Sequence, residues 1–261
     1  MSSETLERRF AAVGARLKVD EGPWRGEPTI NIRADARGEL FVIGFRVGNR
    51  EVDLEVVDVQ PRERHLLLLA RVGGEKSKFL CGHDERHWFV AAVPEAVRGV
   101  MGVAAAKAAL QPEAVHEGIE RSRPKDPFRR RNAAYVRQGE WFFVPAPGID
   151  PPEAEVVRNE VLTRGAGSTP HLMQFAFRSG GKLVYVNRRH PTGISEAGYA
   201  CLTPEQRRSG GWTPLVRDPE VYAKGAVRHP DHATVHLAPW HRVLMNTEQG
   251  ARAMQHVAFL D

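Results

Sequence analysis

Histidine is concentrated in the second half of this chain, in patterns that could support catalysis. Seven of the eleven histidines follow residue 160. If the segment 233–237 is a strand, its alternating side chains put His232, Thr234 and His236 on one face. Two imidazoles and a hydroxyl on one face could bind a divalent metal or transfer protons near neutral pH. The alternative is that these histidines are surface or hydrogen-bonded residues of a sheet.

A second pattern, His-x-Thr, occurs twice in the same half of the chain. One copy spans 190–192 and the other spans 232–234. Two such units facing each other would resemble the paired motifs of the 2H phosphoesterases, in which imidazoles exchange protons and threonines hold a phosphate. The resemblance covers these few residues alone, so we assign the chain to no family. It implies a histidine-dependent phosphodiesterase or nuclease-like enzyme that uses His190, Thr192, His232 and Thr234. His236, from the pattern on one strand face, completes the set of candidate catalytic residues.

Cysteine and histidine also lie close together in the first half of the chain. Cys81, His83 and His87 form a Cys-x-His-x3-His cluster that offers three zinc ligands. No Cys-x2-Cys pair is present to complete a closed zinc site. Strand-like residues flank the cluster, so a hairpin loop without a metal explains it equally. We therefore predict no metal ligand from the sequence, and we identify no cofactor.

Basic residues are clustered in the middle of the chain. Residues 121–137 carry seven of them against Asp126 as the one acid. Arginine presents a rigid fork of donors that matches phosphate, and interleaved aromatic rings can stack on unpaired bases. A solvated linker is the alternative. The candidate nucleic-acid-binding residues are Arg121, Arg123, Lys125, Arg129, Arg130, Arg131, Tyr135 and Arg137.

The distribution of charge favours a polyanionic partner more than the formal net charge of +5 does. Residues 161–261 hold 12 basic against 7 acidic residues, and they follow the basic cluster. Such a field attracts RNA or single-stranded DNA mainly through phosphate contacts. We therefore predict a nucleic-acid-associated protein. The alternatives are the phosphodiesterase described above and a non-catalytic assembly subunit that binds an acidic protein partner, so whether the chain is an enzyme stays open.

The remaining composition indicates a folded protein of a reducing compartment. No apolar run approaches the roughly 18 residues that a membrane-spanning helix needs, and the charged amino-terminal segment has no signal-peptide core. Two cysteines, Cys81 and Cys201, cannot form a disulfide framework. We expect a cytoplasmic protein that does not associate with a membrane.

These candidate residues must be positioned by strands and a few helices. Short strand-like segments with tight connections predict an antiparallel meander in the first half. Apolar spacing and capping residues predict helices over 5–18, 94–110 and 247–257, and short helices after Thr203 and Asp218. The predicted strands are 29–32, 40–45, 52–57, 66–72, 78–81, 88–93, 135–136, 141–144, 155–162, 172–177, 183–186, 226–227 and 234–237.

The pattern as a whole predicts an α+β protein with antiparallel, β-rich halves and a few flanking helices. We divide it into three parts. Residues 1–118 form a helix, a β meander and a second helix; residues 119–132 form a basic linker; and residues 133–261 form a basic, histidine-rich domain that contains β structure.

Overall fold

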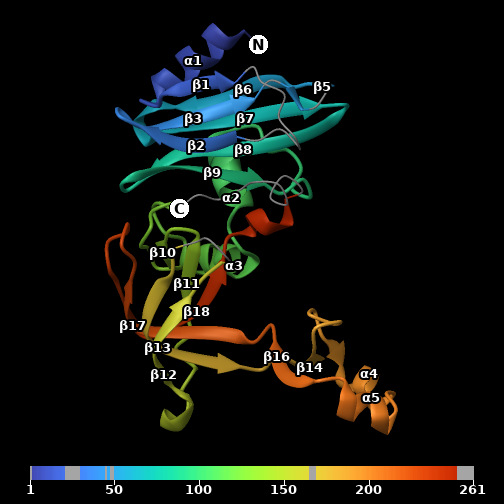
Figure 1. Cartoon of the computed structure of the whole chain (residues 1–261). Coiled ribbons are helices and arrows are strands. Elements are labelled where there is room, and N and C mark those ends of the chain that lie inside the picture. The colour runs from blue at the N-terminus through green and yellow to red at the C-terminus, as the bar shows by residue number, and fades with distance from the viewer. Residues whose placement is uncertain (1, 21–29, 45, 48–49, 165–168, 252–261) are drawn as a thin grey trace.

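The structure is a computed structural model that describes residues 2–20, 30–44, 46–47, 50–164 and 169–251. Two β-rich halves lie one above the other, and an arm extends from the second (Figure 1). The helices are α1 (Ser3–Ala12), α2 (Val103–Ala109), α3 (Glu113–Ser122), α4 (Glu196–Ala200) and α5 (Pro204–Ser209), with 3-10 turns η1 (Pro61–Glu63), η2 (Glu153–Glu155) and η3 (Thr247–Gly250).

The strands divide between the two halves. Those of the first half are β1 (Leu17–Asp20), β2 (Ile30–Asp35), β3 (Gly38–Gly44), β4 (Arg46–Val47), β5 (Arg50–Glu51), β6 (Asp53–Gln60), β7 (His65–Val72), β8 (Glu75–Asp84) and β9 (His87–Val93). Those of the second half are β10 (Val136–Gln138), β11 (Trp141–Pro145), β12 (Val157–Leu162), β13 (His171–Ser179), β14 (Lys182–Val186), β15 (Ile194–Ser195), β16 (Thr213–Arg217), β17 (Glu220–Arg228) and β18 (Val235–Met245).

The first half encloses a core between two sheets. β6 to β9 form an antiparallel meander in chain order, while β3 pairs antiparallel with β2 and parallel with β1. α1 covers this core with Leu6 and Phe10, which are fully buried. Its first turn is capped by the Ser2 side chain, which accepts a hydrogen bond from the Thr5 amide.

The apolar run in β7 is continuous because both faces of this strand are covered. Leu66 and Leu68 face the core under α1, whereas Leu67 packs with Val103 and Ala106 of α2 on the other face. A strand that is buried on both sides loses the polar and apolar alternation of a half-exposed strand.

The second half is built on a six-stranded antiparallel sheet in the order β10-β11-β18-β17-β13-β12. Phe143, Met173 and Val227 are fully buried in its core. α3 covers part of this half, with Val115 packed against Phe142 of β11. The sheet therefore brings strands from both ends of the second half next to one another.

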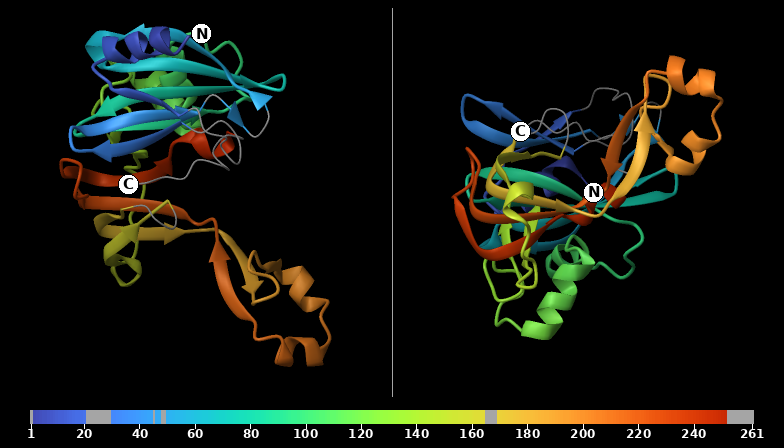
Figure 2. Two further views of the ribbon diagram at one scale, coloured as in Figure 1. Left: turned by 45° about the horizontal axis from the view of Figure 1, so that its top comes forward. Right: turned by 90° about the horizontal axis from the view of Figure 1, so that it is seen from below.

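An arm formed by β14 to β16 and helices α4 and α5 projects from the second half (Figures 1 and 2). None of its residues between 182 and 217 is buried. Aromatic stacking holds the arm together: Tyr185 lies 3.7 Å from Tyr199 between ring centres, and His190 lies 5.4 Å from Trp212.

The predicted α+β class, with antiparallel sheet in both halves, is confirmed. The helix after Thr203 is also confirmed, and it begins with a complete capping box to Gln206. The helix predicted after Asp218 is wrong. Asp218 has a φ of +50°, outside the helical region, and the chain enters β17 at Glu220.

Several predicted boundaries are wrong because glycines redirect the chain. The helix predicted over 5–18 ends at Ala12, since Gly14 has a φ of +79°, and Leu17 begins β1 instead. The helix predicted over 94–110 begins only at Val103, because Gly99 has a φ of +74°. α3 occupies 113–122, and the segment predicted as a final helix contains η3, with 252–257 outside the described residues.

Within the described ranges, no helix is long and apolar enough to span a membrane.

Candidate metal centre

A cavity of about 540 Å³ lies between the two halves. Its upper wall comes from β2, β8 and β9, and its lower wall comes from β10 and the loop between β17 and β18. Apolar side chains such as Leu80, Phe89 and Phe128 line it together with several histidines and charged residues. This volume is typical of small-molecule sites, which occur preferentially between domains.

Three histidines meet at the lower wall of this cavity. His171 is the first residue of β13, and His229 and His232 belong to the β17–β18 loop. One ring nitrogen of each lies within 4.8 Å of those of the other two. The ring centres of His171 and His229 are 4.2 Å apart, and those of His229 and His232 are 4.7 Å apart.

His171 is buried, and its ring contacts are with other aromatic rings, including those of His229 and His232. It is 2% exposed, and among the described residues neither of its ring nitrogens has a hydrogen-bond partner. Burial, reinforced by His229 and His232, lowers the pKa of His171 to about 3. A buried polar group without a partner costs about 1–3 kcal/mol. His171 is therefore a buried neutral imidazole with two further imidazoles beside it.

The other two histidines are held in place by neighbouring polar groups. Nδ1 of His229 accepts a hydrogen bond of 3.1 Å from the Asp231 amide, and Nε2 lies 3.2 Å from the Thr169 carbonyl oxygen. Nδ1 of His232 lies 3.6 Å from Oε2 of Glu85. Burial, followed by repulsion from His229, lowers the pKa of His232 to about 4. Hydrogen bonds therefore orient the His229 ring, and metal ligation would replace one of its two contacts. Nδ1 of His232, in contrast, has no hydrogen-bond partner among the described residues.

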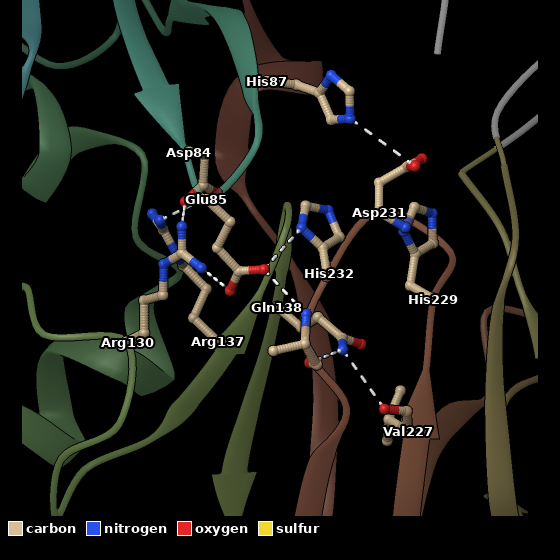
Figure 3. Close-up of polar contacts among 11 residues, drawn as sticks. Asp84, Glu85, His87, Arg130, Arg137, Gln138, Val227, His229, Asp231 and His232 are labelled. Atoms are coloured by element: carbon tan, nitrogen blue, oxygen red, sulfur yellow. Dashed lines mark hydrogen bonds and ion pairs between the residues drawn. The ribbon is translucent and has the colours of Figure 1, made fainter.

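The β8–β9 hairpin of the first half reaches down to this loop (Figure 3). Glu85 at its tip accepts a hydrogen bond of 2.9 Å from the Ala233 amide and forms an ion pair with Arg130. Asp84 pairs with Arg130 and lies 3.4 Å from Nη2 of Arg137. The carboxylate beside His232 therefore comes from one half and the histidine from the other.

Gln138 fixes the loop from below. This residue is 1% exposed, and its side-chain amide donates to the carbonyl oxygens of Ala233, at 2.7 Å, and Val227, at 3.4 Å (Figure 3). The two bonds tie β10 to the end of β17 and to the segment that precedes β18. The loop that carries His229 and His232 is thereby anchored on both sides.

Three imidazoles in this arrangement can bind one transition-metal ion. Imidazole nitrogen suits zinc, copper, iron and nickel, and three protein ligands with an open fourth position are typical of catalytic zinc. Ligands at 2.0–2.1 Å in a tetrahedral site stand about 3.3 Å apart. The ring nitrogens lie within 4.8 Å of one another, so they would have to approach more closely to share one ion.

Gly139 leaves the space that such an ion requires. A Cβ atom at this position would lie 3.0 Å from Nε2 of His232 and 3.6 Å from Nε2 of His171. Gly139→Ala is therefore expected to lower the affinity for Zn²⁺ by at least about tenfold, measured by competition with a chromophoric chelator.

Gly211→Ala is the matched control for this prediction. Gly211 has a φ of +59°, close to the +57° of Gly139, but nothing lies within 4 Å of its added Cβ. The two variants should share the backbone strain, which costs about 1 kcal/mol. If Gly139→Ala and Gly211→Ala bind zinc with equal affinity, the space next to Gly139 is not the position of the ion.

The sequence-predicted catalytic residues are only partly brought together. β18 begins at Val235, so His232 and Thr234 precede the strand and do not alternate with His236, which is exposed. The other two predicted residues, His190 and Thr192, lie on the arm. The structure therefore does not place the two His-x-Thr units opposite each other, and of these five residues only His232 lines the cavity.

The predicted nucleic-acid-binding residues divide into two groups. Tyr135 is 1% exposed, with its hydroxyl donating to the Pro127 carbonyl oxygen at 2.7 Å, and Arg130 and Arg137 line the cavity. The remaining residues are exposed, although Arg131 also donates to the His236 carbonyl oxygen at 3.0 Å. This exposed group consists of Arg121, Arg123, Lys125, Arg129 and Arg131.

The Cys-x-His-x3-His cluster forms the predicted hairpin between β8 and β9. Cys81 is 1% exposed within the core of the first half, where burial raises the pKa of its thiol. His83 and His87 line the cavity instead. The three side chains do not form a common metal site among the described residues.

Sequence reasoning missed His171 and His229 as members of one site. The pairing of β13 with β17 opposes Leu172 to Arg228, and this register sets the two histidines side by side. The available signal was a histidine at the start of one predicted strand and another after the next long strand, but their pairing could not be read from the sequence.

Comparisons with known proteins give no indication of function for this chain. No family model, no curated protein and no solved structure matches this chain.

Proposed function

We propose that this chain is a metal-dependent enzyme of the hydrolytic type. His171, His229 and His232 hold one divalent transition-metal ion, for which zinc is the best fit, and the cavity between the halves takes a small-molecule substrate. Such an ion, when bound by these three residues, would supply the Lewis acidity that lowers the pKa of a water molecule.

The observation that carries this proposal is the state of His171. An imidazole that is 2% exposed, with no hydrogen-bond partner at either nitrogen and two further imidazoles beside it, is costly without a ligand. Metal ligation compensates this cost, because a neutral imidazole is the form that binds a metal. The lowered pKa of His171, about 3, keeps it neutral at physiological pH.

Two further features support a catalytic over a purely structural centre. The donor set offers three ligands, which leaves a coordination position for water. The site also opens into a cavity of about 540 Å³, large enough for an organic substrate.

Metal binding is the direct test. The full-length protein, stripped with a chelator and dialysed, is titrated with Co²⁺, whose visible absorption reports coordination number, and with Zn²⁺ in competition. One equivalent bound with micromolar or tighter affinity, with the spectrum of a four- or five-coordinate ion, is expected. Failure to bind either ion with millimolar or better affinity would refute the proposal.

Nucleic-acid binding is a second candidate function, favoured by the exposure of five basic residues between 121 and 131. In this case RNA or single-stranded DNA would bind mainly through its phosphates. Its contact surface would be Arg121, Arg123, Lys125, Arg129 and Arg131.

A salt titration of binding to labelled single-stranded RNA and DNA tests this second candidate. Because each phosphate contact adds about 0.7 to the slope of log affinity against log salt for single strands, Arg121→Ala with Arg123→Ala should flatten the slope by about 1–1.5. Arg8→Ala with Arg9→Ala, on exposed positions of α1, is the control and should leave the slope unchanged. Weak, salt-independent binding by the unmodified protein would eliminate this function.

A further inference from the structure

We propose that His87 is the proton acceptor for the reaction at the three-histidine centre and that Glu39 holds it in position. This inference rests on the metal-dependent function proposed above. Both residues belong to the first half of the chain and line the cavity opposite the metal ligands.

Glu39 and His87 form a well-defined dyad. Nδ1 of His87 lies 2.7 Å from Oε1 of Glu39, and Oε2 of the same carboxylate accepts a hydrogen bond of 2.8 Å from the Trp88 amide. Both carboxylate oxygens are thus engaged and the carboxylate cannot turn away. When Nδ1 donates its proton to this carboxylate, Nε2 is the ring atom that can accept a proton from a reactant.

Nε2 of His87 lies next to the β17–β18 loop, which carries two of the metal ligands. Nε2 of His87 lies 3.8 Å from Oδ1 of Asp231, whose own amide donates to Nδ1 of His229. Figure 3 shows the His87 ring pointing to Asp231, with His229 and His232 beyond it. Nε2 of His87 therefore borders Asp231, the residue that precedes His232 in the chain, and it lines the same cavity as the metal ligands.

The charges around His87 suit a group that must accept a proton. Glu39 lies on one side of the ring and Asp231 on the other, so the imidazolium formed by proton transfer has a carboxylate at each nitrogen. The side chain is 51% exposed and borders the cavity, so a water molecule or a substrate can reach it. General bases of this kind typically contribute 10²–10⁴-fold to a rate.

The proposed step is an ester hydrolysis. A water molecule at the three-histidine centre gives one proton to Nε2 of His87 while its oxygen forms a bond to the carbonyl carbon of the ester. The bond between that carbon and the leaving oxygen then breaks, and its electron pair leaves with that oxygen. His87 finally returns the proton to the leaving group or to solvent, which restores the neutral imidazole.

The experiment compares variants of the zinc-loaded full-length protein with 4-nitrophenyl acetate as the probe. His87→Ala is expected to lower kcat by about 10²-fold while KM and the zinc content stay unchanged. Glu39→Gln, which keeps the shape but removes the charge, should cause a smaller loss. Added imidazole should restore part of the activity of His87→Ala, as a purely structural role would not allow.

His116→Ala is the matched control, because His116 does not line the cavity and its Nε2 lies 3.0 Å from the Ala108 carbonyl oxygen. It should keep the turnover of the unmodified protein. Unchanged turnover in His87→Ala would overturn the inference, and so would loss of zinc from that variant, since His87 would then only join the two halves.

The wild-type protein separates this inference from the function on which it rests. If the protein binds zinc but hydrolyses the probe no faster than the zinc-free protein, the role of His87 is refuted while the metal centre stands. If the protein binds no zinc, the proposed function itself fails.

Discussion

His171→Ala is expected to lower the affinity of the chain for Zn²⁺ and Co²⁺ by at least about 100-fold. Loss of a residue that only supports a metal ligand typically costs 10–100-fold, and loss of a ligand costs no less. The same change should abolish the stabilisation by metal, which amounts to about 2.7 kcal/mol when free metal is 100 times its dissociation constant. Isothermal titration and thermal unfolding with and without Zn²⁺ measure the two effects.

In the absence of metal, the same variant should behave unlike most core substitutions. Alanine leaves a cavity, but it also removes a buried imidazole that has no hydrogen-bond partner among the described residues. These contributions oppose each other, so the free energy of unfolding of the metal-free variant should lie within about 1 kcal/mol of the unmodified value.

His241→Ala is the control for both measurements. His241 is 4% exposed and buried like His171, but its Nδ1 lies 2.8 Å from the Pro239 carbonyl oxygen and it does not line the cavity. Its replacement should reduce stability and leave metal affinity unchanged. If His171→Ala keeps full zinc affinity, His171 is not a ligand of the proposed site.

Acid should destabilise the metal-free protein through His65. Burial is the main cause that lowers the pKa of this cavity-lining imidazole from 6.5 to about 4. The unfolded chain therefore takes up the proton first as the pH falls. Stability that is fully present above pH 6.5 is lost progressively down to about pH 4, by about 3 kcal/mol from this one group.

Chemical denaturation of the unmodified protein and of His65→Gln at pH 7 and pH 4, with a chelator present, measures this contribution. Glutamine does not titrate, so the stability difference between the two proteins should shift by about 2–3 kcal/mol in favour of the variant at the lower pH. If the stabilities of the two proteins change equally with pH, His65 binds its proton equally well in the folded and unfolded chains. Burial of His65 would then not be the cause of acid destabilisation.

Residues of both halves of the chain form the candidate site. The metal ligands belong to the second half, whereas Glu85 and the Glu39–His87 dyad belong to the first. The β8–β9 hairpin supplies both Glu85 and His87 and pairs with the second half through Arg130. Docking of the two halves is therefore needed to assemble the proposed chemistry.

Local sequence patterns were sufficient for most of the secondary structure. The meander of the first half was predictable because β6 to β9 are short, apolar and joined by tight turns, which leave only antiparallel neighbours. The N-cap at Thr203 was readable because it is followed directly by Pro204, and proline is favoured at the first helical position. Glycine conformations, such as Gly99 at a φ of +74°, were not readable because glycine allows both signs of φ.

The site required the three-dimensional fold. Histidine enrichment after residue 160 was visible, but it pointed to His232 and His236 on one strand. The strand begins at Val235, and the partners of His232 are His229 and the distant His171.

The physical reason is the register between strands. Side-chain periodicity within one strand is a local property, whereas the pairing of β13 with β17 and the docking of the β8–β9 hairpin depend on packing between remote segments. The same packing buried Tyr135 and paired Arg130 with Asp84 and Glu85, so a continuous basic segment became partly an interior network. The residue types were present in the sequence. Their grouping arose from strand register within the second half and from contacts between the two halves.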